Sequence, residues 1–190
     1  MRTFIYYSAR ARTSGNWKDL MSAGRMDIVC NSLIQAFFIS NQMRDDVHLH
    51  LIFDGQPNPP MHLEFISHPD MPISKKDVGG LIKRMLYKCS KKKKTEVFPG
   101  CYIEKKSLSA LLKELEKEGK TIQVLDAKGK NLREVKGSEL GKSIFLIGDH
   151  EGLPKKELKR YKDRISVGQP IYFASQTFVI IHNELDLRKL

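Results

Sequence analysis

Apolar and polar residues follow two different periods along this chain, and the two periods predict different elements. Short apolar or alternating runs are typical of strands, whereas apolar residues three and four positions apart are typical of helices. The first pattern predicts strands over residues 2–9, 47–55, 62–67, 121–127, 143–149 and 164–168. The second predicts helices over residues 19–40, 73–89, 107–119, 153–161 and 175–188.

Residues that favour caps and turns punctuate these elements. Ser107 and Gly119 are typical of the two ends of a helix, and Pro154 suits the first turn of the helix predicted after it. Gly24 weakens the first turns of the helix over residues 19–40. Residues 128–131, KGKN, read as a turn between elements.

Strands and helices are interleaved along the whole chain rather than segregated. That order predicts an α/β fold with a mostly parallel sheet and helices on both faces. A chain of 190 residues, 41% of them hydrophobic, is long enough to bury one good core. We therefore expect a single domain over residues 1–190.

The balance of charge favours a polyanionic partner. The chain has 33 Lys and Arg against 22 Asp and Glu, a formal net charge of +11. Such an excess is typical of proteins that bind nucleic acid. The N-terminal sequence MRTFIYYSARARTSG has no signal-peptide core, and no apolar run reaches the roughly 18 residues of a membrane span. We expect a cytoplasmic protein without a membrane partner.

The spacing of cysteine, histidine and acidic residues does not indicate a metal site. The cysteines are three in number and lack a CxxC spacing, so neither a disulfide framework nor a zinc site is predicted. His48 and His50 share one face of a strand, but the sequence shows no third ligand beside them. Asp149, His150 and Glu151 are loop neighbours, which rarely converge on an ion.

Three predicted strands end in loops that suit a ligand. In a parallel sheet, ligands bind beyond the carboxyl ends of the strands, where residues 124–127, 147–154 and 166–175 fall in this sequence. Gly148 and Gly152 allow the main chain to turn sharply and approach a ligand closely. The alternative is that these glycines only mark tight turns. The chain has no GxGxxG after a strand and no GxxxxGK[ST], which argues against Rossmann-type and phosphate-loop sites.

Two of these segments resemble a known family. The stretch IFLIGDHEGLP followed by RISVGQPIYFASQTFVIIHNELD is similar to the C-terminal signature of the SPOUT class of RNA methyltransferases. The stretches ARTSGNWKDLMSAGRMDIVCNSLIQAFF and VHLHLIFDGQPNPPMHLEF resemble the archaeal TrmY family of tRNA (pseudouridine(54)-N1)-methyltransferases. The resemblance covers nearly the whole chain.

The resemblance implies a deep C-terminal trefoil knot, a homodimer and S-adenosylmethionine (SAM) as cofactor. Its substrate would be the T-loop of tRNA, methylated at N1 of pseudouridine 54. Carried over residue by residue, it predicts a cofactor site in the late strand-end loops. The predicted cofactor-binding residues are Leu125, Gly148, Val167, Gly168, Ile171, Tyr172, Phe173, Ala174, Ser175 and Gln176. For Phe173 the alternative is core packing.

The acceptor chemistry indicates where the catalytic residues lie. Pseudouridine has a C-glycosidic bond, so N1 carries a weakly acidic proton that a carboxylate or water has to accept, while an Arg or a main-chain donor stabilises the anion. We predict Arg25 and Asp27 beside the acceptor base, with Asp54 as a third candidate. The alternative for Arg25 and Asp27 is that they are surface charges.

Basic residues of the N-terminal half are candidates for binding RNA. The predicted contacts are Arg10, Arg12, Trp17, Lys83, Arg84, Lys91 and Lys92. The first two would bind phosphates, and Trp17 would stack on an unpaired base. Lysine runs are more often simply solvated, and the tryptophan would equally suit an anchor for its loop.

Two other functions remain open on the sequence. One is a Nep1-type methyltransferase that modifies pseudouridine in ribosomal RNA, with the same chemistry and fold. The other is an RNA-binding module that has lost its cofactor. Transfer of a methyl group to a defined RNA separates all three.

Overall fold

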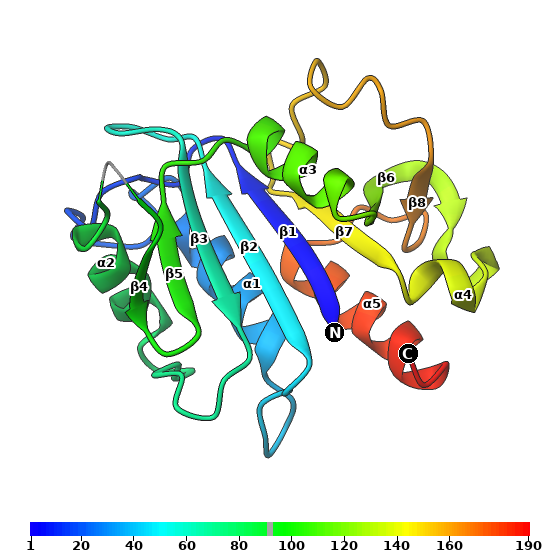
Figure 1. Cartoon of the computed structure of the whole chain (residues 1–190), viewed down its shortest axis with the longest axis horizontal. Coiled ribbons are helices and arrows are strands. Elements are labelled where there is room, and N and C mark those ends of the chain that lie inside the picture. The colour runs from blue at the N-terminus through cyan, green and yellow to red at the C-terminus, as the bar shows by residue number, and fades with distance from the viewer. Residues whose placement is uncertain (91–92) are drawn as a thin grey trace.

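The computed structural model describes residues 1–90 and 93–190, which together form an eight-stranded sheet in the order β4-β5-β3-β2-β1-β7-β6-β8 (Figure 1). Strands β2, β1, β7, β6 and β8 run parallel, and β3, β5 and β4 continue the sheet in antiparallel pairs. The prediction of a mostly parallel α/β sheet is confirmed. The strands are β1 Arg2–Ser8, β2 Val47–Phe53, β3 Met61–Ile66, β4 Thr95–Phe98, β5 Cys101–Glu104, β6 Thr121–Asn131, β7 Ser143–Gly148 and β8 Arg164–Ser166.

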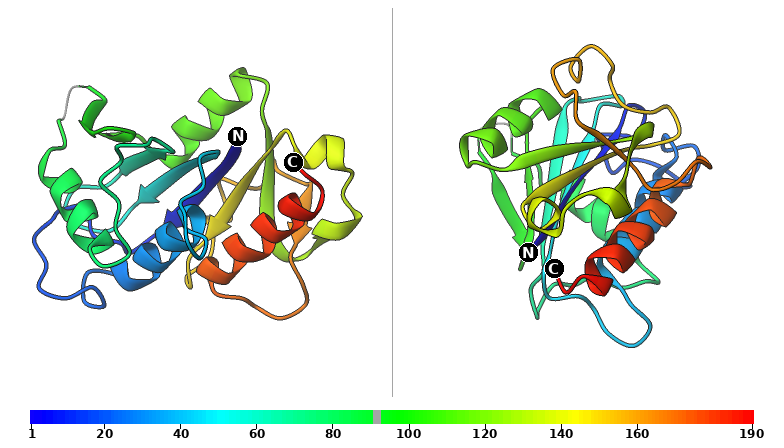
Figure 2. Two further views of the ribbon diagram at one scale, coloured as in Figure 1. Left: turned by 90° about the horizontal axis from the view of Figure 1, so that it is seen from below. Right: turned by 90° about the vertical axis from the view of Figure 1, so that its right-hand side faces the viewer.

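Helices cover both faces of this sheet (Figures 1 and 2). Helices α1, α2 and α5 lie on one face and α3 lies on the other. Strand β1 shows the cause, because Phe4 and Tyr6 pack into the core under α1 and α5, whereas Ile5 and Tyr7 pack under α3. The helices are α1 Met26–Phe37, α2 Val78–Tyr87, α3 Leu108–Lys117, α4 Gly137–Leu140 and α5 Ala174–Leu187, with a 3₁₀ turn at Leu132–Glu134.

The last helix returns to the middle of the sheet. Strand β8 lies at the edge, yet Phe178 of α5 packs against Phe4 of β1 with 5.0 Å between ring centroids. Helix α5 also packs alongside α1. The connection over residues 167–173 therefore crosses from the sheet edge to its centre, and this crossing forms part of the candidate site. None of the described helices combines the length and apolar composition needed to cross a membrane.

Two predicted helices begin later than their patterns indicated. The helix predicted from residue 19 starts at Met26, because Gly24 has a φ of 72° and its backbone lies against the carbonyl of Arg10. Such a positive φ interrupts a right-handed helix. The helix predicted from residue 73 starts at Val78, where its buried apolar face begins. At the N-terminal ends of these two helices, glycine and charged residues prevented the helix from starting where the spacing of apolar residues predicted.

Two further predictions from local sequence were wrong, and one element was missed. Residues 153–161 form turns instead of a helix, because Leu158 is the single fully buried side chain among closely spaced lysines, which repel one another. The expected turn KGKN belongs to the end of β6, where Lys130 pairs with Ile165 of β8. The hairpin of β4 and β5 was not predicted, since each strand has only four residues.

Candidate functional site

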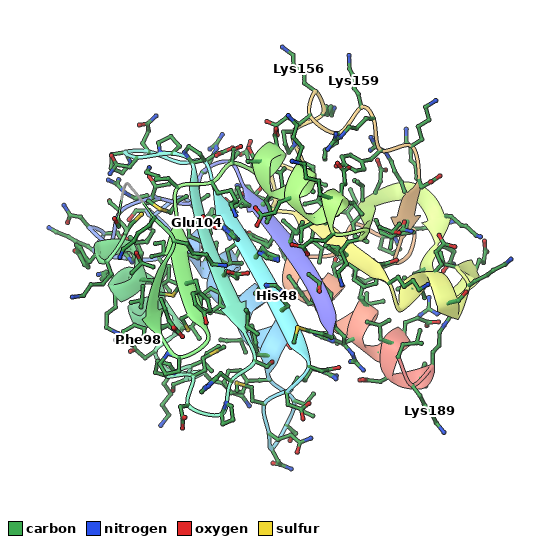
Figure 3. The ribbon with its side chains drawn as sticks, viewed as in Figure 1. His48, Phe98, Glu104, Lys156, Lys159 and Lys189 are labelled. Carbon is green, nitrogen blue, oxygen red and sulfur yellow. The ribbon has the colours of Figure 1, made fainter. Side chains whose placement is uncertain are left out.

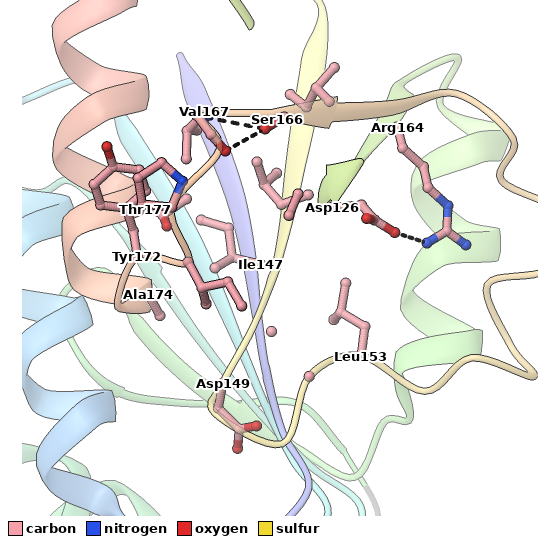
Figure 4. Close-up of a pocket in the computed structure, with 18 of the residues that line it drawn as sticks. Asp126, Ile147, Asp149, Leu153, Arg164, Ser166, Val167, Tyr172, Ala174 and Thr177 are labelled. Atoms are coloured by element: carbon pink, nitrogen blue, oxygen red, sulfur yellow. Dashed lines mark hydrogen bonds and ion pairs between the residues drawn. The ribbon is translucent and has the colours of Figure 1, made fainter. Parts of the chain in front are cut away.

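A pocket opens where the middle of β6, just after its pairing with β7 ends, and the carboxyl end of β7 meet the segment that follows β8 (Figure 4). Its walls are mostly apolar, and charged side chains gather at one side. The apolar lining comprises Leu125, Ile147, Leu153, Ile165, Val167, Ile171 and Tyr172. The polar and charged lining comprises Asp126, Asp149, Lys155, Arg164, Ser166 and Thr177. An apolar pocket with a few placed polar groups is typical of a small-molecule site.

Main-chain packing explains the glycine at the end of β7. A Cβ added at Gly148 would lie 2.9 Å from the carbonyl carbon of Gly152 and 3.0 Å from Cγ of Leu153. The hairpin-like turn that closes here is fixed by a hydrogen bond of 2.9 Å from the Gly152 N–H to the Asp149 carbonyl. Any side chain at position 148 would push this turn away from the strand end and reshape the pocket.

Seven of the ten predicted cofactor-binding residues meet around this pocket. They are Leu125, Gly148, Val167, Gly168, Ile171, Tyr172 and Ala174. In the described part of the chain, the lining does not include Phe173, Ser175 or Gln176. The Phe173 side chain is 67% exposed, and its backbone N–H donates to Oε1 of Gln176 at 3.0 Å, which caps α5. The role of all ten as cofactor ligands stays a prediction.

An ion pair lies beside the pocket, between β6 and β8. The guanidinium of Arg164 donates to Asp126, and the backbone N–H of Lys128 donates to Oδ1 of the same carboxylate at 3.0 Å (Figure 4). The Lys128 N–H and then the Arg164 side chain lower the pKa of Asp126. This pair supplies hydrogen-bonding groups next to an otherwise apolar wall.

The predicted catalytic pair Arg25 and Asp27 is brought together at the start of α1. Nε and Nη2 of Arg25 each donate to one carboxylate oxygen of Asp27 at 3.0 Å. Arg25 adopts φ 63°, which is unusual for a residue other than glycine and turns its side chain back toward Asp27. The hydrogen bond from Arg25 lowers the pKa of the Asp27 carboxyl, so the group stays ionised.

Tyr6 connects this pair to the pocket. The Tyr6 hydroxyl and Oδ2 of Asp149 are both buried and have no hydrogen-bond partner within residues 1–90 and 93–190. Burial and then the charges of Asp149 and Asp27 raise the pKa of Tyr6, while Arg25 opposes the shift. The charges of the Arg25–Asp27 pair and of the pocket residue Asp149 therefore all act on the Tyr6 hydroxyl.

Asp54 lies apart from the other two catalytic candidates. Its Oδ2 accepts a hydrogen bond of 2.9 Å from the Tyr7 hydroxyl. Tyr7 belongs to the core under α3, whereas Tyr6 belongs to the core on the opposite face of the sheet. Burial and then this hydrogen bond raise the pKa of Tyr7. The structure therefore separates Asp54 from Arg25 and Asp27.

Several of the predicted RNA contacts have partners within the protein. Arg10 forms an ion pair of 3.0 Å with Glu151, and Arg84 forms one of 2.9 Å with Asp77. Nζ of Lys83 donates to the Trp17 carbonyl at 2.9 Å and lies 5.2 Å from the ring centroid. That arrangement matches the alternative in which the tryptophan anchors its loop.

Three predicted RNA contacts remain, Arg12, Lys91 and Lys92, and the structure describes only the first of them. The backbone N–H of Arg12 donates to the Ala23 carbonyl at 3.1 Å, which ties the first loop together. Lys91 and Lys92 lie outside the described residues. Their part in RNA binding stays a prediction.

Sequence reasoning missed two parts of this region. Asp149 and Tyr6 had a usable signal, since one directly follows Gly148 and the other lies on the neighbouring strand. The second part is a basic loop of exposed side chains beside the pocket, Lys155, Lys156, Lys159, Arg160 and Lys162. Lys156 and Lys159 project outward from it (Figure 3). The incorrect helix prediction for residues 153–161 hid this loop.

Comparison with known families and proteins agrees with this geometry. The family model for SAM-dependent RNA methyltransferases matches residues 1–190. The tRNA (pseudouridine(54)-N(1))-methyltransferase of Methanosarcina mazei is 34% identical over 98% of this chain and 91% of its own. The enzyme with the same name from Methanocaldococcus jannaschii is 32% identical over 100% of this chain and 98% of its own.

A solved structure shares the fold. The crystal structure of Archaeoglobus fulgidus Nep1 bound to S-adenosylhomocysteine is similar with a TM-score of 0.65 and 14% identity. The similarity covers 100% of this chain and 99% of that chain. At this identity the likeness concerns the arrangement of the elements.

Proposed function

This chain belongs to the family of SAM-dependent RNA methyltransferases, and we propose that it methylates N1 of pseudouridine 54 in the T-loop of tRNA. The observation that carries the proposal is similarity at 30–34% identity, over 98–100% of this chain, to relatives named for that reaction. The pocket beside the middle of β6 and the end of β7 supports it. We take residues 1–190 as one catalytic domain.

The pocket fits the cofactor that the family requires. Leu125 and Ile171 offer apolar surface to an adenine ring, and the main chain at Gly148 and Val167 offers hydrogen-bonding groups to its edge. Asp126 and Ser166 lie in the same lining and suit the hydroxyls of a ribose. Bound SAM supplies an activated methyl group on a sulfonium, so the protein has mainly to align donor and acceptor.

The charged groups around Tyr6 suit the acceptor base. N1 of pseudouridine gives up its proton as it takes the methyl group, and the uracil ring carries negative charge in between. We assign Asp149 as the group that receives or orients this proton, because its Oδ1 is held by the Glu151 N–H at 2.8 Å while its buried Oδ2 has no hydrogen-bond partner among the described residues. Arg25, fixed by Asp27, stabilises the developing charge.

The family also implies a homodimer, and exposed apolar residues support one. Val179 is 46% exposed on α5 and Ile39 is 38% exposed just after α1. Both line a hollow between these neighbouring helices. A second copy seated there would cover an apolar surface that is costly to leave in water. We propose this face as the dimer interface.

We also infer that the C-terminal segment forms the deep trefoil knot of the SPOUT class. The path of residues 167–173, from the sheet edge past the end of β7 to the central helix α5, supports a threaded connection.

Capture of tRNA relies on the basic surface near the pocket mouth. The exposed lysines of the loop over residues 155–162 lie closest to the site, and Lys155 lines the pocket itself. Contacts of this kind bind phosphates without reading sequence. This activity belongs in the cytoplasm.

A transfer assay with matched RNAs tests the proposal. Purified protein is incubated with methyl-labelled SAM and a T-arm hairpin that carries either pseudouridine or uridine at position 54, or with a ribosomal hairpin that carries pseudouridine. We expect label only in the first RNA, because uridine uses N1 for its glycosidic bond. Preference for the ribosomal hairpin would assign the Nep1-type activity instead. RNA binding without SAM binding would assign a non-enzymatic module.

A further inference from the structure

A cluster of histidines and glutamates lies on the sheet face that β2, β3 and β5 share, beyond the part that α3 covers. His48 and Glu104 mark the cluster on the face turned toward the viewer in Figure 3. The other members are His50, His62 and Glu64. His50, His62 and Glu64 are almost completely buried, at 2%, 1% and 6% exposure. Buried ionisable side chains in this number need a reason.

Part of the cluster is a directed chain of hydrogen bonds. Glu104 lies 2.8 Å from the ammonium of Lys106, so it is a carboxylate that accepts a hydrogen bond of 3.0 Å from Nδ1 of His62. Nε2 of a neutral His62 is then an acceptor, and Nδ1 of His50 donates to it at 2.9 Å. Once Nδ1 of a neutral His50 carries the proton, its Nε2 carries a lone pair.

That lone pair is buried without a partner. Nε2 of His50 has no hydrogen-bond partner among the described residues. A buried polar atom without a partner costs free energy and is rare in folded proteins. The other ring nitrogen of His50, Nδ1, donates to His62, which in turn donates to the carboxylate of Glu104. A hydrogen bond from the second ring nitrogen also orients histidines that ligate metals. An ion is the partner that both observations favour.

We propose that His48, His50 and Glu64 bind a divalent transition-metal ion of the zinc class. Each residue can offer one ligand atom such that all three atoms lie within 4.8 Å of one another. Two imidazoles and one carboxylate are a common ligand set for zinc, with water as the fourth ligand. In tetrahedral zinc sites the ligand atoms lie about 3.3 Å apart, so modest side-chain rotations close the set.

The third ligand lies on the neighbouring strand β3, so the spacing of residues in the sequence did not show it. The sequence places His48 and His50 on one strand face without a third ligand, and it favours solvent-facing side chains. In the structure, Glu64 of the antiparallel strand β3 pairs directly with His50, and its Oε1 lies 2.8 Å from Nε2 of His48. The expectation that this chain has no metal site therefore rested on a pattern that could not include β3.

The proposed ion would tie β2 to β3, away from the cofactor pocket. His48 pairs with Thr3 of β1, which pairs with Ile144 near the start of β7, whereas Gly148 ends that strand. The proposed site therefore lies apart from the methyl-transfer pocket. Lys94, which forms an ion pair with Glu64, competes with a bound cation.

Metal binding by the tag-free protein tests the proposal. Protein stripped with a chelator is titrated with zinc chloride against a colorimetric competitor, and with cobalt chloride to observe the visible bands of tetrahedral Co²⁺. We expect one zinc per chain. His50→Gln and His48→Gln should each weaken binding by at least about tenfold, and Lys94→Gln should strengthen it. His48→Gln guards against a folding defect, because His48 is only partly buried.

Matched controls make the outcome decisive. His68→Gln removes an exposed histidine outside the cluster and should bind zinc like the unaltered protein. Circular dichroism in the presence of chelator establishes that each variant is folded. Less than stoichiometric zinc in the unaltered protein, or equal affinity in the His48 and His68 variants, would overturn the proposal.

Discussion

Asp149 combines three properties that a group handling a proton needs. It directly follows the strand end that forms the pocket, one oxygen is fixed by the main chain, and the other is buried without a hydrogen-bond partner among the described residues. Its charge, with that of Asp27, raises the pKa of Tyr6 on the neighbouring strand. Methyl transfer needs precise alignment more than strong acid or base chemistry.

Replacing Asp149 by Asn should slow methyl transfer. We expect kcat to fall about 100-fold, because an amide cannot accept the N1 proton, while the dissociation constant for SAM stays nearly unchanged. Single-turnover assays and calorimetry separate the two quantities. Glu157→Gln, an exposed neighbour on the basic loop, is the control and should retain activity. An unaltered kcat in Asp149→Asn would remove this residue from the proposed mechanism.

Gly148→Ala tests how the pocket is built. The added Cβ would meet Gly152 and Leu153 at 2.9 to 3.0 Å, so the turn after β7 has to move. We expect SAM to bind about tenfold more weakly, with little change in RNA affinity. Gly141→Ala is the control, because its Cβ would meet the nearest atoms at an ordinary 3.5 Å. Equal SAM affinity in both variants would contradict the placement of the pocket.

At the scale of elements, one ion-pair cluster joins β1, the turn before β2, and α5. Nη1 and Nη2 of Arg44 donate to the two oxygens of Asp186 at 3.0 and 2.7 Å, and Arg2 lies 2.6 Å from the same carboxylate. The hydrogen bond from Arg44, and then Arg2, lower the pKa of Asp186 to about 2. The helix that completes the pocket is anchored by this cluster at its far end.

Asp186→Asn should therefore destabilise the protein in a pH-dependent way. A depressed carboxyl pKa stabilises the folded state above the unfolded pKa of 3.8, and this contribution is lost as the pH falls through about 2. We expect the free energy of unfolding to drop by about 1 kcal/mol at pH 7, a figure reduced for solvent screening. Urea unfolding across pH 2 to 7, with exposed Asp45→Asn as control, measures the difference. A difference between the Asp186 variant and the unaltered protein that did not shrink toward pH 2 would contradict this reading.

Elements with a strong apolar period were predictable, and those governed by distant contacts were not. Strands β1, β2 and β7 are buried on both faces, and the apolar run of β1 and β7 and the alternating pattern at the start of β2 made them plain in the sequence. The end of β6 was mistaken for a turn because it pairs with β8, which is distant in sequence, at a place where a Cβ added to Gly129 would lie only 2.6 Å from backbone atoms of Ile165. No local pattern records such an approach.

The candidate site also has parts that the sequence predicted and parts that it did not. That the loops after β7 and β8 meet at one pocket was predictable, because strand ends, glycines and a family signature coincide there. The carboxylate of Asp54 was grouped with Arg25 and Asp27 on proximity in the N-terminal half, but Tyr7 holds it on the other side of the sheet. Which face a side chain joins depends on tertiary packing.

At the scale of the molecule, we propose different partners for the basic surface and for the exposed apolar residues. The net charge of +11 favours tRNA, and the apolar residues of the hollow between α1 and α5 are the proposed contact with a second copy of the chain. The two surfaces use different residues, so each can be disrupted without the other.

Val179→Glu should convert the dimer to a monomer. The substitution places a charge on the apolar part of the proposed interface, where burial would be costly. Sedimentation velocity should show the mass of a single chain for this variant and twice that mass for the unaltered protein. Lys189→Gln, at the exposed C-terminal end, lowers the net charge by the same one unit and should remain dimeric. A monomeric unaltered protein with full activity would contradict the dimer.

The position of the transferred methyl group decides whether this protein modifies pseudouridine 54. Full-length tRNA with pseudouridine at position 54 is incubated with the protein and SAM, digested, and analysed by mass spectrometry of the fragments and nucleosides. We expect one added methyl group, on the base of nucleotide 54, as N1-methylpseudouridine. A methyl group on a ribose, or on a base at any other position, would contradict the proposal.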